Sequence, residues 1–150
     1  MRKPTHADAE LLLHLYEMRR DAELRHARKW FLTDFRAQSW AEIKSRYLSH
    51  SDEDRWFRMV TSYWEMVAAL VRHGALHAEL FYDTTGEDVA VWDRCKAWVP
   101  EARATFRPSY LWQLERLAAG HVAHRARVNA AFAKGAAARP ARPRARKRSG

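Results

Sequence analysis

Residues 51–83 read SDEDRWFRMVTSYWEMVAALVRHGALHAELFYD, and this stretch decides the fold. Its polar and small side chains, which can face solvent, recur at steps of four, three, four and three residues and so lie along one side of an α-helix. They are Arg58, Ser62, Glu65, Ala69 and Arg72. Most other positions from 56 to 71 are apolar, so more than half of the helix circumference requires burial. The pattern predicts a central helix in an all-α domain.

The composition fits one such domain. The chain has 150 residues, 47% of them hydrophobic, with seven Trp, six Phe and five Tyr, which is enough to fill a core. Cys95 shares a helical face with Val91, Trp92, Trp98 and Val99, so we expect a buried thiol. No segment approaches the roughly 18 apolar residues of a membrane span, and no leader-like apolar region follows the start of the chain. We therefore expect a soluble, cytoplasmic protein.

Capping residues predict where the helices begin. A Ser, Thr or Asp oxygen can accept a free backbone N–H, and an acid three residues later can return the bond. Thr5, Ser39 and Ser51 fit this pattern, Asp21 is a further cap, and Ser109 precedes a last helix. The ends follow from the apolar patterns and glycines, which predict helices over residues 6–20, 21 to about 35, 40–47, 51–73, 75–82, around 91–98, and 109–134.

These segments predict an all-α, single-domain bundle of five to seven helices. Residues 1–134 form the bundle with a projecting last helix, and 135–150 form a disordered basic tail rich in Arg, Pro and Ala. In the first helix, Leu12, Leu15 and Tyr16 are expected to face inward. Two alternatives stay open: residues 6–37 as one kinked helix, and a hairpin that pairs 81–82 with 89–92.

Charge is distributed unevenly along the chain. Residues 1–115 hold 17 Lys and Arg against 18 Asp and Glu, whereas the rest of the chain holds ten Lys and Arg and no acid. Such a cluster binds polyanions by counterion release. The predicted polyanion-binding residues are Arg116, Arg125, Arg127, Lys134, Arg139, Arg142, Arg144, Arg146, Lys147 and Arg148. Aromatic side chains that stack on bases are missing from this cluster, so we expect contacts to phosphates. The alternative is a solubilising tail.

Other site patterns are weak in this sequence. All five glycines are isolated, which excludes a Gly-rich phosphate loop, and no nucleophile elbow is present. His73 and His77 have metal-pair spacing, but Gly74 between them should end the helix. His121 and His124 are expected to be solvated on a basic helix. We therefore predict no catalytic residue, no metal site and no cofactor.

On this basis the sequence favours a non-enzymatic binding or regulatory module. Its basic end would contact nucleic acid or another polyanion, while the bundle would offer a face to a protein partner. The alternative is an enzyme or small-molecule sensor, with an aromatic pocket among Tyr63, Trp64, Trp92 and Trp98.

The run from Arg58 to Tyr82 also resembles a family of small bacterial helical proteins that is a domain of unknown function. That family has an aromatic-rich helix ending in Leu-Val-x-x-Gly, a short segment closing on an aromatic pair, then Gly and a helix bearing Trp or Phe. The counterparts here are Leu70, Val71, Gly74, Leu80, Phe81, Tyr82, Gly86 and Trp92. The resemblance covers roughly residues 10–118. It implies the helical fold and no catalytic residue.

Overall fold

A computed structural model of the chain describes residues 2–137, and its regular structure is entirely helical. The elements in that range are α1 (His6–Met18), α2 (Ala22–Thr33), α3 (Trp40–Glu42), the π-helical η1 (Ile43–Tyr47), α4 (Asp52–Arg72), α5 (Ala78–Tyr82), α6 (Glu87–Cys95), α7 (Val99–Thr105) and α8 (Trp112–Ala137). The all-α bundle is thus confirmed. Among the described residues the α-helices number eight, one more than expected, because Pro100 lies in the first turn of α7, where its missing N–H costs nothing.

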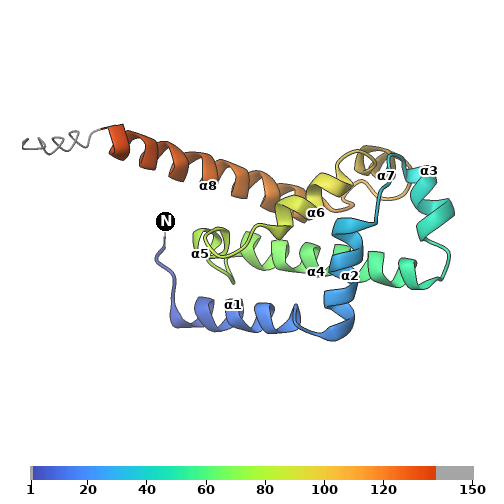
Figure 1. Cartoon of the computed structure of the whole chain (residues 1–150), viewed down its shortest axis with the longest axis horizontal. Coiled ribbons are helices and arrows are strands. Elements are labelled where there is room, and N and C mark those ends of the chain that lie inside the picture. Colours follow the sequence, from blue (N-terminus) through green and yellow to red (C-terminus); the bar gives the residue numbers. More distant parts are fainter. Residues whose placement is uncertain (1, 138–150) are drawn as a thin grey trace, which may run out of the picture.

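The central helix is α4, as its sequence pattern predicts. Figure 1 shows α2 crossing it steeply and α8 running along its other side. Its side chains Phe57, Val60, Trp64 and Val67 are buried. Phe57 joins an aromatic cluster whose other members come from α2, η1 and the connection between them, namely Trp30, Phe31, Phe35 and Tyr47. This cluster lies where α2 crosses α4.

The first 33 residues form two helices, which settles one open alternative. The Asp21 side chain accepts hydrogen bonds from the backbone N–H groups of Glu23 and Leu24, both at 3.0 Å, and so begins α2. Leu15 is buried as expected, but Tyr16 was wrongly placed inward, because it is 58% exposed. Adjacent helix positions are about 100° apart, and only the narrow stripe of α1 that carries Leu15 faces the body.

Two helix ends show where local sequence signals hold and where they fail. α4 ends at Arg72, and Gly74 follows with φ of 73°, the left-handed conformation expected of it. Ser109 does not cap the last helix, which starts at Trp112. Instead Glu65 of α4 accepts from the backbone N–H groups of Gln113 and Leu114, at 3.2 and 2.9 Å. The cap of α8 thus comes from α4, and residues 109–111, just before α8, form a turn.

The last helix also runs further than expected. Residues 135–137, assigned to the disordered tail, belong to α8. Residues 138–150 lie outside the described residues. The hairpin alternative is wrong, because 78–82 and 87–95 are both helical.

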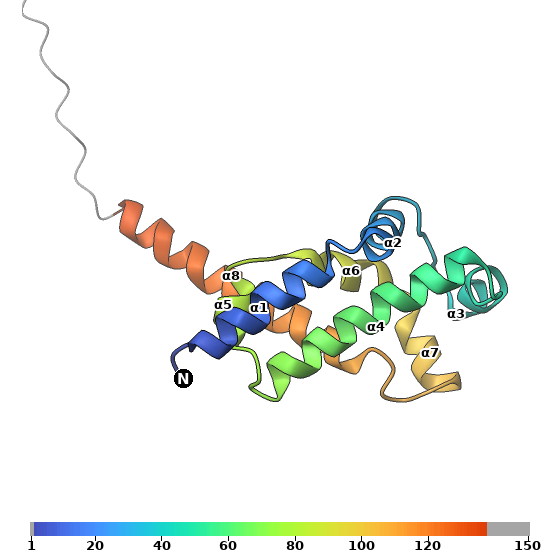
Figure 2. The ribbon, with the colours of Figure 1, turned by 90° about the horizontal axis from the view of Figure 1, so that it is seen from below.

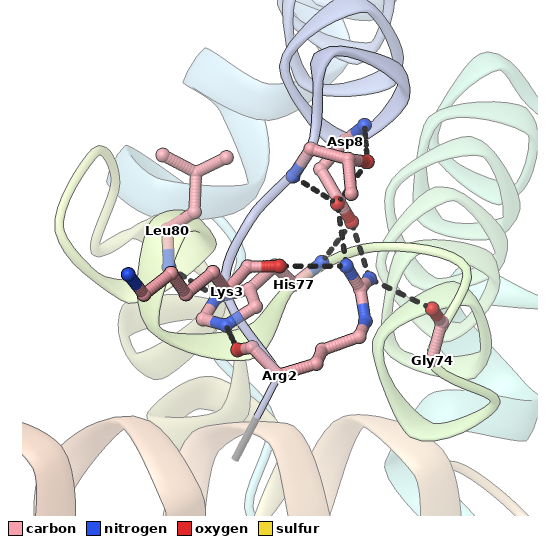
Figure 3. A network of polar contacts seen from close by, with 7 residues as sticks. Arg2, Lys3, Asp8, Gly74, His77 and Leu80 are labelled. Carbon is pink, nitrogen blue, oxygen red and sulfur yellow. Dashed lines mark hydrogen bonds and ion pairs between the residues drawn. The ribbon is translucent and has the colours of Figure 1, made fainter.

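A buried carboxylate ties the N-terminal segment to the turn between α4 and α5 (Figure 3). Asp8 is buried and pairs with the Arg2 guanidinium, at 2.6 and 2.5 Å. It also accepts from the backbone N–H of His77 at 2.8 Å and from Thr5. Arg2 in turn donates to the carbonyl of Gly74 at 2.9 Å. Asp8 therefore accepts from three residues that belong to two segments far apart in the sequence.

Replacing Asp8 by Ala should lower the thermal midpoint by several degrees at pH 7, because these donors lose their acceptor. Hydrogen bonds from Arg2 and Thr5 hold the pKa of Asp8 well below its usual range. A carboxyl group with a lowered pKa stabilises the fold above its unfolded pKa of about 3.9 and loses this effect as the pH falls toward the folded value.

Thermal melts of the wild type, Asp8→Ala and the exposed control Glu10→Ala, at pH 7 and pH 3, measure this effect. The deficit of Asp8→Ala should be smaller at pH 3, and Glu10→Ala should match the wild type at pH 7. An equal deficit at both pH values would contradict the assigned role of the Asp8 charge.

Candidate functional site

The second half of α8 extends beyond the body of the bundle, as the sequence predicts. Both views show it running away from the other helices (Figures 1 and 2). Residues 129–136 are all exposed, and Phe132 reaches 77%. A helix that buries none of its faces over two turns offers its side chains to solvent or to a partner.

The four predicted basic residues of α8 lie in different settings. Arg116, Arg127 and Lys134 follow one side of the helix, spaced by eleven and seven residues, or about three and two turns. Arg127 is 3.8 Å from Glu79, while Arg116 and Lys134 have no acidic partner within residues 2–137. Arg125 lies on the opposite side, and its guanidinium passes over Gly86, where any Cβ would be only 2.0 Å from it. The six predicted residues from Arg139 to Arg148 lie outside the described residues.

An aromatic residue stands at the base of this helix. The Arg72 and Arg116 guanidinium carbons lie 5.2 and 5.1 Å from the Trp112 ring centroid, within the range of cation–π attraction. Trp112 is 37% exposed, and in the described part of the chain neither arginine pairs with an acid. Trp112 thus places an aromatic ring next to Arg116, the first residue of a basic cluster in which we expected no aromatic side chain. The i, i+4 spacing of Trp112 and Arg116 could have predicted their contact from the sequence. The contact with Arg72 could not be predicted in this way, because Arg72 lies at the end of α4.

The two histidines of α8 are not solvated, which corrects a second expectation. His121 is fully buried, and its Nδ1 lies 2.9 Å from both carboxylate oxygens of Asp88, which is also buried. His124 Nε2 lies 2.8 Å from Asp83. The acids precede the histidines by 33 and 41 residues, so inspection of the helix alone could not find them.

The Asp88–His121 pair is a structural contact. The His121 ring stacks on Tyr82, with centroids 4.9 Å apart, and its Nε2 is buried without a hydrogen-bond partner in the described structure. Tyr82 in turn packs against Gly120, where a Cβ would come within 2.5 Å of its hydroxyl. The arrangement joins α8 to α5 and α6 but does not present the imidazole to a dissolved substrate.

The four aromatic residues of the predicted pocket do not meet. Tyr63 and Trp64 border a groove of about 270 Å³ between α1, α4 and α5. Trp98 is buried elsewhere, stacked on Trp40 at 5.9 Å, and Trp92 is half-buried on α6. The Tyr63 hydroxyl donates to the Leu15 carbonyl at 2.8 Å, and burial raises the pKa of Tyr63 to about 12. That hydroxyl is thus a structural donor.

The remaining candidate groups have structural roles. Arg19 borders the same groove, but its charge is taken up by Glu87 at 2.8 Å. Gly74 separates His73 from His77, as expected, and His77 Nε2 lies 2.6 Å from the Arg2 carbonyl. Burial raises the pKa of the Cys95 thiol, which therefore stays protonated at neutral pH. Over residues 2–137, no cluster of three or more His, Cys, Asp or Glu side chains could hold a metal ion, and no helix is long and apolar enough to cross a membrane.

Comparison with known families finds one match. The family model of a domain of unknown function, DUF4760, matches residues 4–121. The chain belongs to this family. No curated protein and no solved structure matches the chain.

The DUF4760 match divides the basic surface. Arg72, Trp112 and Arg116 lie inside it, together with all of α1 to α7. Arg125 to Lys134, on the projecting half of α8, lie beyond its last residue, His121. The DUF4760 bundle thus carries the arginine-flanked Trp112, and the basic extension is added to it.

Proposed function

We propose that the protein is a non-enzymatic, cytoplasmic binding module whose α8 contacts the phosphates of nucleic acid. The observation that carries the proposal is the partly exposed Trp112 ring next to Arg72 and Arg116, two cations without an acidic partner in the described part of the chain. The buried free thiol of Cys95 fits a reducing compartment.

The charge along α8 supports the same function. From Arg116 onward the chain contains ten Lys and Arg and no acid, so no carboxylate of this segment repels a bound phosphate. Arg127 and Lys134 continue the side of the helix that Arg116 begins. A single-stranded nucleic acid could place phosphates along this side and stack one base on Trp112, a contact worth roughly 1–3 kcal/mol. Phosphate contacts would therefore supply most of the affinity, and stacking on the Trp112 ring would give a preference for single strands.

A salt titration of binding tests this function. In fluorescence anisotropy with duplex and single-stranded oligonucleotides, the logarithm of the binding constant should fall linearly with the logarithm of the salt concentration. The slope should be about −0.9 per contacted phosphate on duplex and about −0.7 on single strands. Arg116→Gln and Arg72→Gln should each remove about one phosphate contact and so make the salt dependence less steep by the slope of one contact. Arg20→Gln, an exposed arginine on the body, is the matched control and should change nothing.

Two further variants separate the parts of the surface. Trp112→Ala should weaken single-stranded binding more than duplex binding. Truncation after Lys134 removes six of the ten cations and should weaken both. Equally weak binding by the intact and truncated proteins at low salt would reject the proposed function.

A further inference from the structure

A second cavity lies at the opposite end of the molecule from the projecting part of α8. It has a volume of about 570 Å³, within the usual range of roughly 300–1,000 Å³ for small-molecule sites. Its lining comes from α3 and η1, the first half of α4, and the turn after α7. Both views place α3 and α7 together at that end, far from the tip of α8 (Figures 1 and 2).

The charges that line this cavity are all positive. Lys44, Arg58 and Arg107 border it, and no acidic side chain does. Arg58 Nε donates to Asp54 at 2.6 Å, which fixes the direction of that side chain. In the described part of the chain Lys44 and Arg107 have no acidic partner, so their charges are available to an anion.

Aromatic rings form the other walls. Trp40, Phe106 and Tyr110 lie with ring centroids 5.6–5.7 Å from one another. Phe106 is 61% exposed, so its ring is accessible to a ligand from solvent. The Arg107 guanidinium lies 5.5 Å from the Tyr110 ring centroid, so a cation stands beside the aromatic wall.

Polar contacts behind the cavity hold these walls in place. Arg103 donates to the Tyr110 carbonyl at 2.9 Å and pairs with Glu115 at 2.7 Å, which fixes the turn after α7 to α8. The Trp40 backbone N–H donates to Glu101 at 2.7 Å, which joins α3 to α7. A site whose walls are held by a supporting layer of hydrogen bonds is preorganised for a ligand.

The backbone here is also unusual. Lys44 lies on the π-helical η1, and such segments occur often at functional sites. Leu111, just after the turn, has φ of 50°, which is costly for a residue other than glycine. Both irregularities border the walls of this cavity or the loop that forms them.

We propose that this cavity binds a nucleoside monophosphate. The ring of the base would lie against Phe106 and Tyr110, and the phosphate would lie between Lys44 and Arg107. The volume, the purely positive lining and the exposed ring together fit a small molecule that is aromatic at one end and anionic at the other. The site is independent of the polyanion surface and does not rest on it.

Isothermal titration calorimetry of the full chain tests the proposal with AMP, GMP, CMP and UMP, and with the four corresponding nucleosides and inorganic phosphate as partial ligands. At least one of the four nucleotides should bind saturably. The nucleotide should bind at least about tenfold more tightly than the nucleoside or phosphate alone, because each of these makes only half of the contacts.

Variants then locate the site. Lys44→Gln and Arg107→Gln should each weaken binding by about tenfold, the typical effect of removing one charge-assisted hydrogen bond, and Phe106→Ala should weaken it severalfold. All three side chains are largely exposed, so the fold should survive. Lys96→Gln, an exposed lysine outside the cavity, is the control and should bind as the wild type. Arg116→Gln should also leave nucleotide binding unchanged while it weakens oligonucleotide binding, which separates the two sites.

Three results would overturn the proposal. The first is no saturable binding of any of the four nucleotides below about 1 mM. The second is inorganic phosphate binding as tightly as the nucleotides. The third is unchanged nucleotide affinity in both Lys44→Gln and Arg107→Gln.

Discussion

Replacing Trp64 by Ala should reduce the free energy of unfolding by about 3–5 kcal/mol, the usual cost of emptying a large aromatic site. Trp64 is 1% exposed in the middle of α4. Its ring packs edge-on against Tyr63 and Phe81, with centroids 5.2 and 6.3 Å away, and the Arg19 guanidinium carbon lies 5.4 Å from it. Three side chains therefore lose a contact when the ring is removed, and none of them can fill the space without moving.

Urea unfolding of three variants checks this prediction. Trp64→Phe should lose much less than Trp64→Ala, because the ring remains and the indole N–H that disappears has no hydrogen-bond partner in the described structure. Met66→Ala, an exposed position two residues later on the same helix, should change stability by about 0.5 kcal/mol or less. A loss below about 1 kcal/mol for Trp64→Ala would show that the ring is not part of the core.

The second large effect is expected at the buried pair between α6 and α8. Asp88→Ala should cost about 3–5 kcal/mol, because removal of one partner leaves the other buried and unpaired. The His121 ring has only this one polar contact, since its Nε2 is already without a partner within residues 2–137. The pair also fixes α8 to the bundle, so its loss acts on the helix that carries the basic surface.

A double-mutant cycle measures the coupling between the two side chains. His121→Leu combined with Asp88→Ala should cost clearly less than the two single losses added together, because neither polar group then remains buried alone. Asp88→Asn keeps a carbonyl acceptor and should lose less than Asp88→Ala. Asp93→Ala, at an exposed ion pair on the same helix, should cost at most about 1 kcal/mol. Additive losses at Asp88 and His121 would contradict the contact.

The sequence by itself determined the features whose physical signals are local. The 3.6-residue period of residues 51–72 specified α4 and its buried face, since both follow from the positions of neighbours on one helix. The cap of Thr5 and the left-handed Gly74 were readable for the same reason, because each satisfies backbone groups only three or four residues away. The uneven charge and the core position of Cys95 were likewise visible without a structure.

Tertiary structure alone decided which distant groups share a site. His121 was expected in solvent, yet it is buried against Asp88, which comes from a helix 33 residues earlier. Glu65 caps α8 in place of Ser109, and Arg72 reaches Trp112 from the end of α4. No periodic pattern records these partners, because each depends on the angle at which two separately formed helices pack. The cavity beside Lys44 is of the same kind: its walls come from three segments whose sequences, read singly, predict only core and surface.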